Sequence, residues 1–302
     1  MSQRLNPFFA QFALIATCFV AIFLMCRTVV ASQVQPLPEA QQPAIVLVTF
    51  GTSVPSAQAA FAHIEQQVRR AFPTHEIRWA YTSKVIRKKL ARSGTMIDSP
   101  EVALAKLMEA GVQRVVVQSL HMNPGAEFHE MCNNSKMFGQ MTGGFERVIV
   151  STPLLASDAA MDKTLRIVAG EIVPKERKPE EAVILMGHGS HHPSDAIYSA
   201  MMYKAQKLDA RMFVATVEGS PSFAEVKEML VHQGIKKAYL VPLMTVAGDH
   251  AINDMAGEGA DSWKSQLRAV GIDAVPVLKG LAEFDSIGAL WLENLREAMK
   301  RE

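Results

Sequence analysis

From residue 44 onward, continuous apolar runs of strand length alternate with stretches of helical periodicity. A run without alternation of apolar and polar residues indicates a strand that is covered on both faces, as in parallel sheets. The alternation of such strands with helices predicts an α/β fold with mostly parallel sheets. The predicted strands are 44–50, 77–81, 115–120, 182–186, 212–216 and 237–241, and clear helices are predicted over about 57–71, 196–208 and 222–231.

The order of elements restarts halfway, and the second half resembles the first in detail. Segment 45–52 matches 183–190, segment 80–83 matches 215–218, and segment 119–127 matches 242–250. We therefore predict two similar doubly wound domains, Rossmann- or flavodoxin-like, that face each other across a cleft. Their expected bounds are 44–170 and 171–282. The amphipathic tail, 283–302, is expected to form a helix that packs back on the first domain.

The N-terminus has the pattern of a secretory signal. Arg4 precedes an uncharged apolar stretch from Leu5 to Cys26, and small residues follow up to Ala31. A basic start, an apolar middle and a small-residue exit are typical of a cleaved signal peptide, here residues 1–31, followed by a polar linker over 32–43. The sequence predicts export to the periplasm, with membrane contact only if the leader stays uncleaved.

Charge and cysteine content exclude several classes of protein and site. The chain has 302 residues and a formal net charge of +1, which argues against a nucleic-acid binder because such a protein needs a basic excess. Only Cys132 remains after the predicted cleavage, so an intrachain disulfide and a cysteine-based metal cluster are both excluded. The sequence leaves a homo-oligomer open.

Three potential metal ligands each follow a predicted strand of the second half: His188, Glu218 and His250. In open parallel sheets, ligands bind beyond the carboxyl ends of the strands, so these side chains can converge. Two imidazoles and a carboxylate suit a divalent ion such as Co²⁺ or Fe²⁺. Three protein ligands also leave coordination positions open, which a site that must release its metal requires.

The counterparts of these ligands in the first half are Phe50, Ser83 and Glu127. Since a phenyl ring cannot bind such an ion and a hydroxyl would bind it weakly, the first half is expected to hold whatever lies against the metal. Phe50 could stack on a ligand or belong to the core, and Glu127 could accept protons. Loop residues that precede helices offer backbone N–H groups to substrate carboxylates; they are Thr52, Ser53, Gly189 and Ser190.

Five motifs together resemble the anaerobic sirohydrochlorin cobaltochelatases, which belong to the class II, ATP-independent chelatases. They are TFGTS at 49–53, QSLH at 118–121, GHGS at 187–190, VEG at 217–219 and PLMTVAGDHAINDM at 242–255. The resemblance implies a chelatase fold, metal ligation by His188, Glu218 and His250, and a substrate contact near His121. It also implies insertion of Co²⁺, or Fe²⁺, into sirohydrochlorin with release of two protons, in tetrapyrrole and cobalamin biosynthesis.

No nucleotide is expected to take part, because the sequence contains neither a GxxxxGK[ST] loop nor a GxGxxG fingerprint. One alternative is a periplasmic metal- or haem-binding protein that kept the scaffold without turnover, with the surface residue His129 as a haem ligand. Another is a zinc hydrolase that uses the histidines around residue 190. His191 and His192 themselves are expected to point elsewhere.

Overall fold

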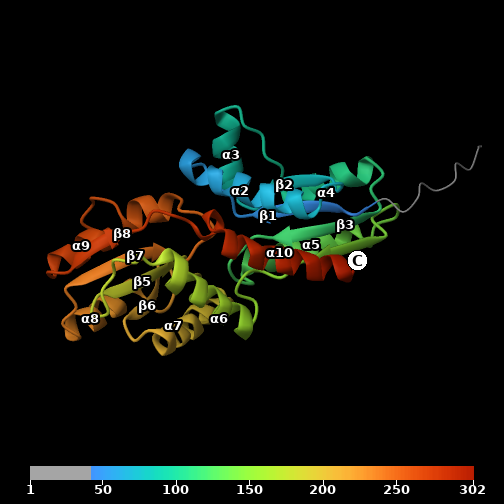
Figure 1. The fold of residues 1–302 in the computed structure, drawn as a ribbon. Coiled ribbons are helices and arrows are strands. Elements are labelled where there is room, and N and C mark those ends of the chain that lie inside the picture. Colours follow the sequence, from blue (N-terminus) through green and yellow to red (C-terminus); the bar gives the residue numbers. More distant parts are fainter. Residues whose placement is uncertain (1–41) are drawn as a thin grey trace, which may run out of the picture. The chain divides into compact units, whose positions relative to one another are not determined.

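Two four-stranded parallel sheets form the framework of the computed structural model (Figure 1). The structure describes residues 42–302, so the predicted leader and nearly all of the linker lie outside the described residues. The first sheet has the order β2-β1-β3-β4 and the second has the order β6-β5-β7-β8. Identical strand orders confirm the duplicated, doubly wound α/β fold. The strands are β1 Ala44–Thr49, β2 Ile77–Tyr81, β3 Arg114–Ser119, β4 Arg147–Val150, β5 Ala182–Gly187, β6 Met212–Thr216, β7 Lys237–Pro242 and β8 Asp273–Pro276.

The central strands β1 and β5 are buried along their whole length. Each lies between two parallel neighbours; Ile45, for example, is in register with Ile77 of β2 and Val116 of β3. Burial on both faces explains why these strands are unbroken apolar runs. The edge strands β4 and β8 were not predicted, because each has only four residues and is partly exposed.

Helices cover the sheets, and serine side chains cap the start of several of them. The Ser99 hydroxyl accepts a hydrogen bond from the Val102 N–H at the start of one helix, and Ser222 forms a capping box with Glu225 at another. The helices are α2 Pro55–Ala71, α3 Lys84–Arg92, α4 Pro100–Glu109, α5 Ala126–Phe138, α6 Asp158–Ile167, α7 Ala196–Leu208, α8 Phe223–His232, α9 Trp263–Ala269 and α10 Asp285–Lys300. Between residues 42 and 302, no helix combines the length and the apolar character needed to cross a bilayer.

The two halves exchange helices. The C-terminal helix α10 packs against β3 and α2 of the first half, as Figure 1 shows. In the other direction, α6 packs on α7 of the second half, where the Lys204 ammonium lies 2.7 Å from Asp158 and 2.8 Å from Asp162. The chain therefore crosses to the second half before α6, earlier than the predicted boundary at residue 170.

One apolar core runs through both halves. Leu47 and Val116 from the first sheet belong to the same buried cluster as Ile184 and Leu240 from the second. Hydrogen bonds reinforce this junction near the carboxyl ends of the strands, where the Thr245 hydroxyl donates to the Leu120 carbonyl at 2.8 Å. The loops that follow the strands of both sheets are thus held against one another, and most of the predicted functional residues lie on these loops, while Glu127 and His129 lie on α5.

Candidate metal and substrate site

His188 and His250 lie face to edge on neighbouring loops. His188 directly follows β5, and His250 ends the loop that follows β7. Their ring centroids are 4.8 Å apart and their planes are inclined by 86°. Both side chains are half-buried. The structure therefore brings together two of the three ligands predicted from the sequence.

The hydrogen bonds of the two imidazoles prepare them for metal binding. Nδ1 of His188 lies 2.8 Å from the Gly189 carbonyl oxygen, and Nδ1 of His250 lies 2.5 Å from Oδ2 of Asp254. Carbonyl and carboxylate oxygens only accept, so each Nδ1 must carry the proton. Each Nε2 therefore presents a free lone pair, and Asp254 provides the carboxylate–histidine contact that commonly orients a metal ligand.

Glu218 is adjacent in the main chain, but its side chain does not complete the group. Its backbone N–H donates to the His188 carbonyl at 2.9 Å. The side chain is exposed and forms no hydrogen bond or ion pair with the rest of residues 42–302. Across this part of the chain, no three or more His, Cys, Asp and Glu side chains are grouped so that they could hold a metal ion. The rotation of the Glu218 side chain about its own bonds is thus unrestrained.

Asp195 joins the two loops that carry His188 and Glu218. Its carboxylate accepts hydrogen bonds from the backbone N–H of Ser190 at 2.9 Å and of Ser220 at 2.8 Å. Gly189 has a φ of +78°, and a Cβ there would lie 2.5 Å from the Gly219 nitrogen. This close approach requires glycine. The sequence therefore fixes the spacing between these loops through Asp195 and Gly189.

Glu127 lies in the first turn of α5, close to the loop that carries His188. The Thr82 hydroxyl donates to its Oε2 at 2.9 Å. Burial raises the pKa of the Glu127 carboxyl above its ordinary value, while the Thr82 hydrogen bond and the nearby His188 lower it in part. A carboxylate with a raised pKa close to the metal ligands suits a proton acceptor.

His121 lies behind Glu127 and is almost fully buried. Its Nδ1 is 3.0 Å from the Ser119 hydroxyl, and its Nε2, which has no hydrogen-bond partner within residues 42–302, is 3.9 Å from Oε2 of Glu127. Desolvation lowers the pKa of His121 to about 4, so the ring is neutral near pH 7. The contact with Glu127 is therefore not an ion pair at that pH.

Several residues predicted to bind substrate also form hydrogen bonds within their own loops. Ser83 is buried as the N-cap of α3, with its hydroxyl accepting from the Ile86 N–H, and the buried Thr52 hydroxyl accepts from the Val54 N–H. Ser53 and Ser190 are half-buried. Phe50, by contrast, is 46% exposed, which makes it available to stack on a flat ligand.

His129 and His192 form a second ring contact, from α5 and from the loop after His188. Their centroids are 5.3 Å apart. The Ser194 backbone N–H donates to Nδ1 of His192 at 3.1 Å, so Nε2 of that neutral ring carries the proton and acts as a donor. His192 therefore differs from His188 and His250, which both present Nε2 as an acceptor. Its role as a helix cap agrees with the expectation that it points elsewhere.

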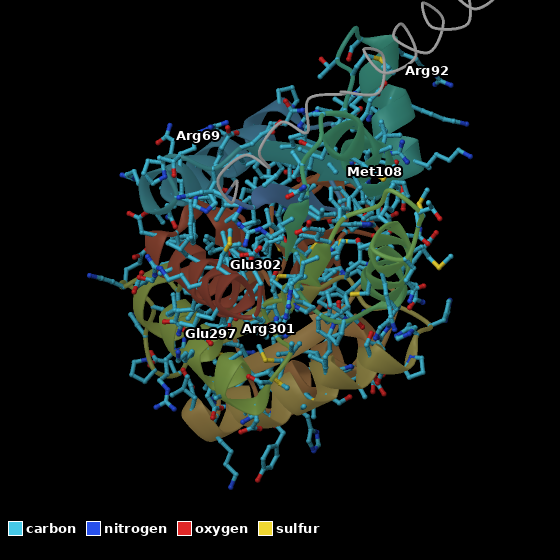
Figure 2. All side chains as sticks on the ribbon, turned by 90° about the vertical axis from the view of Figure 1, so that its right-hand side faces the viewer. Arg69, Arg92, Met108, Glu297, Arg301 and Glu302 are labelled. Atoms are coloured by element: carbon cyan, nitrogen blue, oxygen red, sulfur yellow. The ribbon has the colours of Figure 1, made fainter. Side chains whose placement is uncertain are left out.

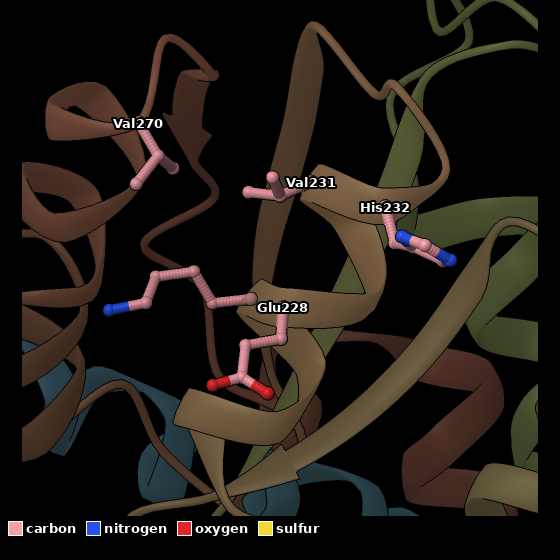
Figure 3. A pocket seen from close by; sticks show the side chains of 5 residues that line it. Glu228, Val231, His232 and Val270 are labelled. Atoms are coloured by element: carbon pink, nitrogen blue, oxygen red, sulfur yellow. The ribbon is translucent and has the colours of Figure 1, made fainter.

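A surface hollow of about 460 Å³ lies away from these residues (Figure 3). Its lining includes His232 and Val231 from the end of α8 and Val270, which follows α9. A helix that connects parallel strands runs back from their carboxyl ends to their amino ends. The hollow therefore lies toward the amino ends of the strands of the second sheet, whereas the histidine pair lies at their carboxyl ends.

Sequence reasoning did not identify Thr82, Asp195 or Asp254. Asp254 had a readable signal, because it stands one helical turn after His250 within the same motif. Thr82 and Asp195 had none, since their partners are backbone groups or side chains distant in sequence.

Several solved structures share this architecture. The structure of SirB from Bacillus subtilis with Fe³⁺ matches with a TM-score of 0.57 at 15% identity, covering 85% of this chain and 96% of SirB. CbiX, described as the terminal enzyme of sirohaem biosynthesis in denitrifying bacteria, matches with a TM-score of 0.52 at 15% identity, covering 85% of this chain and 99% of CbiX. At these identities the likeness establishes the fold alone.

Sequence comparisons go further. The sirohydrochlorin cobaltochelatase CbiKC of Nitratidesulfovibrio vulgaris is 35% identical over 255 residues, which cover 84% of this chain and 90% of that protein. The sirohydrochlorin cobaltochelatase of Salmonella typhimurium is 35% identical over 260 residues, covering 85% and 96%. A family model described as "Cobalt chelatase (CbiK)" matches residues 43–300. The chain belongs to the CbiK cobalt chelatase family.

Proposed function

We propose that the protein inserts Co²⁺ into sirohydrochlorin without ATP and releases two protons, as a step of cobalamin biosynthesis. The observation that carries this proposal is the histidine pair, in which both Nε2 lone pairs are available and the rings are 4.8 Å apart. Two relatives with 35% identity over most of the chain bear the name of this activity. Fe²⁺ suits the same ligands, because imidazole and carboxylate accept either ion.

The metal is a substrate here, and its ligands must hold it and then release it. We assign His188 and His250 as metal ligands and add Glu218 as the third. The backbone of Glu218 is hydrogen-bonded to that of His188, and its side chain is free to rotate. Three protein ligands leave coordination positions of the metal open. Tetrapyrrole nitrogens can bind at these positions before the protein ligands leave. An exposed carboxylate that forms no other hydrogen bond or ion pair suits a ligand that must release the metal.

Glu127 accepts protons from the macrocycle in this proposal. Sirohydrochlorin must lose its pyrrole N–H protons when the metal enters, and the acceptor must be a base at working pH. The raised pKa of Glu127 brings it closer to that of the proton donor than an ordinary carboxyl group would be. The exposed Phe50 ring, on the loop that follows β1, offers the macrocycle an apolar surface.

The test is metallation followed by absorption. Purified mature protein is mixed with sirohydrochlorin and Co²⁺ without ATP, and the spectral change of metallation is compared with the uncatalysed reaction. The proposal expects a rate well above this background and its loss in His250→Ala. A rate equal to the background, or an unchanged rate in His250→Ala, overturns the proposal.

We also propose export to the periplasm, on the signal-like pattern of residues 1–31. A periplasmic binding protein on the same scaffold is the second candidate function, with haem as a ligand of His129. The exposure of His129 supports it. This candidate predicts binding of metal or haem without turnover, and binding that persists in Glu127→Gln.

A further inference from the structure

Helix α3, Lys84–Arg92, carries an unbalanced positive charge. Its outward face holds Lys84, Lys88, Lys89 and Arg92, which are all exposed. None of these four side chains forms an ion pair or a side-chain hydrogen bond with another residue between 42 and 302. In a chain with 31 basic and 30 acidic residues, such a local excess produces a positive field over this surface.

The position of α3 links this charge to the site. The Ser83 N–H, at its N-cap, donates to the Phe50 carbonyl at 3.2 Å, and the preceding residue, Thr82, holds Glu127. The opposite face of α3 is anchored through Leu90 to a small apolar cluster against which Val246, on the His250 loop, also packs. The helix therefore borders both the proposed macrocycle surface and a metal-binding loop.

The figures show how the charged face is presented. Helix α3 stands out from the first sheet beside α2 in Figure 1. Figure 2 shows Arg92 at the outer part of this helix with its side chain directed away from the protein. The charged groups are thus accessible to a ligand that approaches from solvent.

We propose that Lys84, Lys88, Lys89 and Arg92, here called the α3 cations, recruit and orient the tetrapyrrole through its peripheral carboxylates. The inference rests on the proposed function and assigns this surface to the same substrate. Sirohydrochlorin combines a flat apolar ring with many carboxylates at its rim. Phe50 offers a surface to the ring, and the α3 cations offer charge to the rim. Attraction between the α3 cations and the rim carboxylates acts mainly on the rate at which substrate and protein meet and on the orientation of the substrate. This attraction weakens as the salt concentration rises.

The experiment compares two triple variants that remove the same charge. Lys84→Gln/Lys88→Gln/Arg92→Gln removes three of the four α3 cations, and its glutamines keep good helix propensity. The control, Lys175→Gln/Lys178→Gln/Lys236→Gln, neutralises three exposed residues that precede β5 and β7, at the amino ends of those strands. Each protein is titrated with sirohydrochlorin in the absence of metal, and KM is measured for sirohydrochlorin and for Co²⁺ at about 0.01 M and about 0.15 M salt.

The proposal expects sirohydrochlorin binding of the α3 variant to weaken about tenfold at low salt, from three exposed ion pairs. The difference from the parent should shrink at the higher salt, while kcat and the KM for Co²⁺ stay the same. Equal affinity of the α3 variant and the parent at low salt overturns the proposal, and so does equal weakening of the control variant.

A binding assay with anionic phospholipid vesicles tests the other possible target of a basic helix. If the α3 variant loses vesicle binding but keeps its sirohydrochlorin affinity, the α3 cations serve a membrane and the proposal is overturned. The metal-free titration does not depend on turnover. Failure of the chelatase assignment, seen as absence of metallation by the parent, is therefore distinguished from failure of this inference.

Discussion

The burial of His121 makes the stability of the protein depend on pH in a specific way. Desolvation lowers its pKa from 6.5 to about 4, so the folded state excludes a proton that the unfolded chain binds readily. The stability contributed by the neutral ring is fully present above pH 6.5 and is lost as the pH falls toward 4. At pH 5, protonation of His121 shifts the folding equilibrium toward the unfolded chain by a factor of about 30. This factor is equivalent to about 2 kcal/mol of unfolding free energy.

We therefore expect His121→Gln to abolish this part of the pH dependence. Urea unfolding at pH 7 and pH 5, in the presence of a metal chelator, gives the loss of unfolding free energy for each protein. The parent should lose about 2 kcal/mol more than His121→Gln between these pH values, whatever their relative stability at pH 7. Replacement of the exposed His232 by Gln serves as the control and should leave the parent's dependence intact. Equal losses for the parent and His121→Gln would refute the proposed burial of a neutral imidazole.

Three further changes test the site. Asp254→Asn removes the carboxylate that orients His250 and should weaken Co²⁺ binding about 10- to 100-fold by calorimetric titration; unchanged affinity would contradict the assigned contact. Glu127→Gln should lower kcat by about 10²–10⁴ while Co²⁺ affinity is retained. Because the proton acceptor must be ionised, the kcat of the parent should fall as the pH drops through the raised pKa of Glu127. A parent-like kcat in the variant would exclude Glu127 as the proton acceptor. Gly189→Ala should lose at least about 1–2 kcal/mol of stability by thermal unfolding, from the left-handed backbone and the contact with Gly219; a neutral result would mean that the loops can separate.

The sequence predicted the central strands well, because burial on both faces leaves an unmistakable pattern. Segments 44–50 and 182–186 match the central strands β1 and β5 to within one residue. The four-residue edge strands β4 and β8 lack that pattern, since one side of an edge strand is free to be polar. The exchange of α6 and α10 between the halves was also hard to read, because a helix pattern states which face is apolar but not which sheet covers it.

For the site, sequence reasoning found residues at the ends of strands but not their conformations. It placed His188 and His250 together because both follow strands of one parallel sheet. It could not give the direction of the Glu218 side chain, which depends on rotation about its own bonds. It also predicted Ser83 and Thr52 as substrate-binding residues, but it did not show that their hydroxyls accept hydrogen bonds from backbone N–H groups. A serine or threonine before a helix has both readings, and only the structure shows where its hydroxyl lies.

Transfer of a protein-bound ion to the tetrapyrrole tests the central claim most directly. The protein is loaded with one equivalent of Co²⁺, freed of unbound metal, and mixed with sirohydrochlorin together with a chelator that captures any ion released to solution. The account predicts that metallation proceeds within one turnover despite the chelator, and that His188→Ala/His250→Ala forms no product under the same conditions. Product formation that the chelator abolishes, or that the double variant supports equally well, would contradict the assignment of His188 and His250 as the ligands that hold the metal and pass it on.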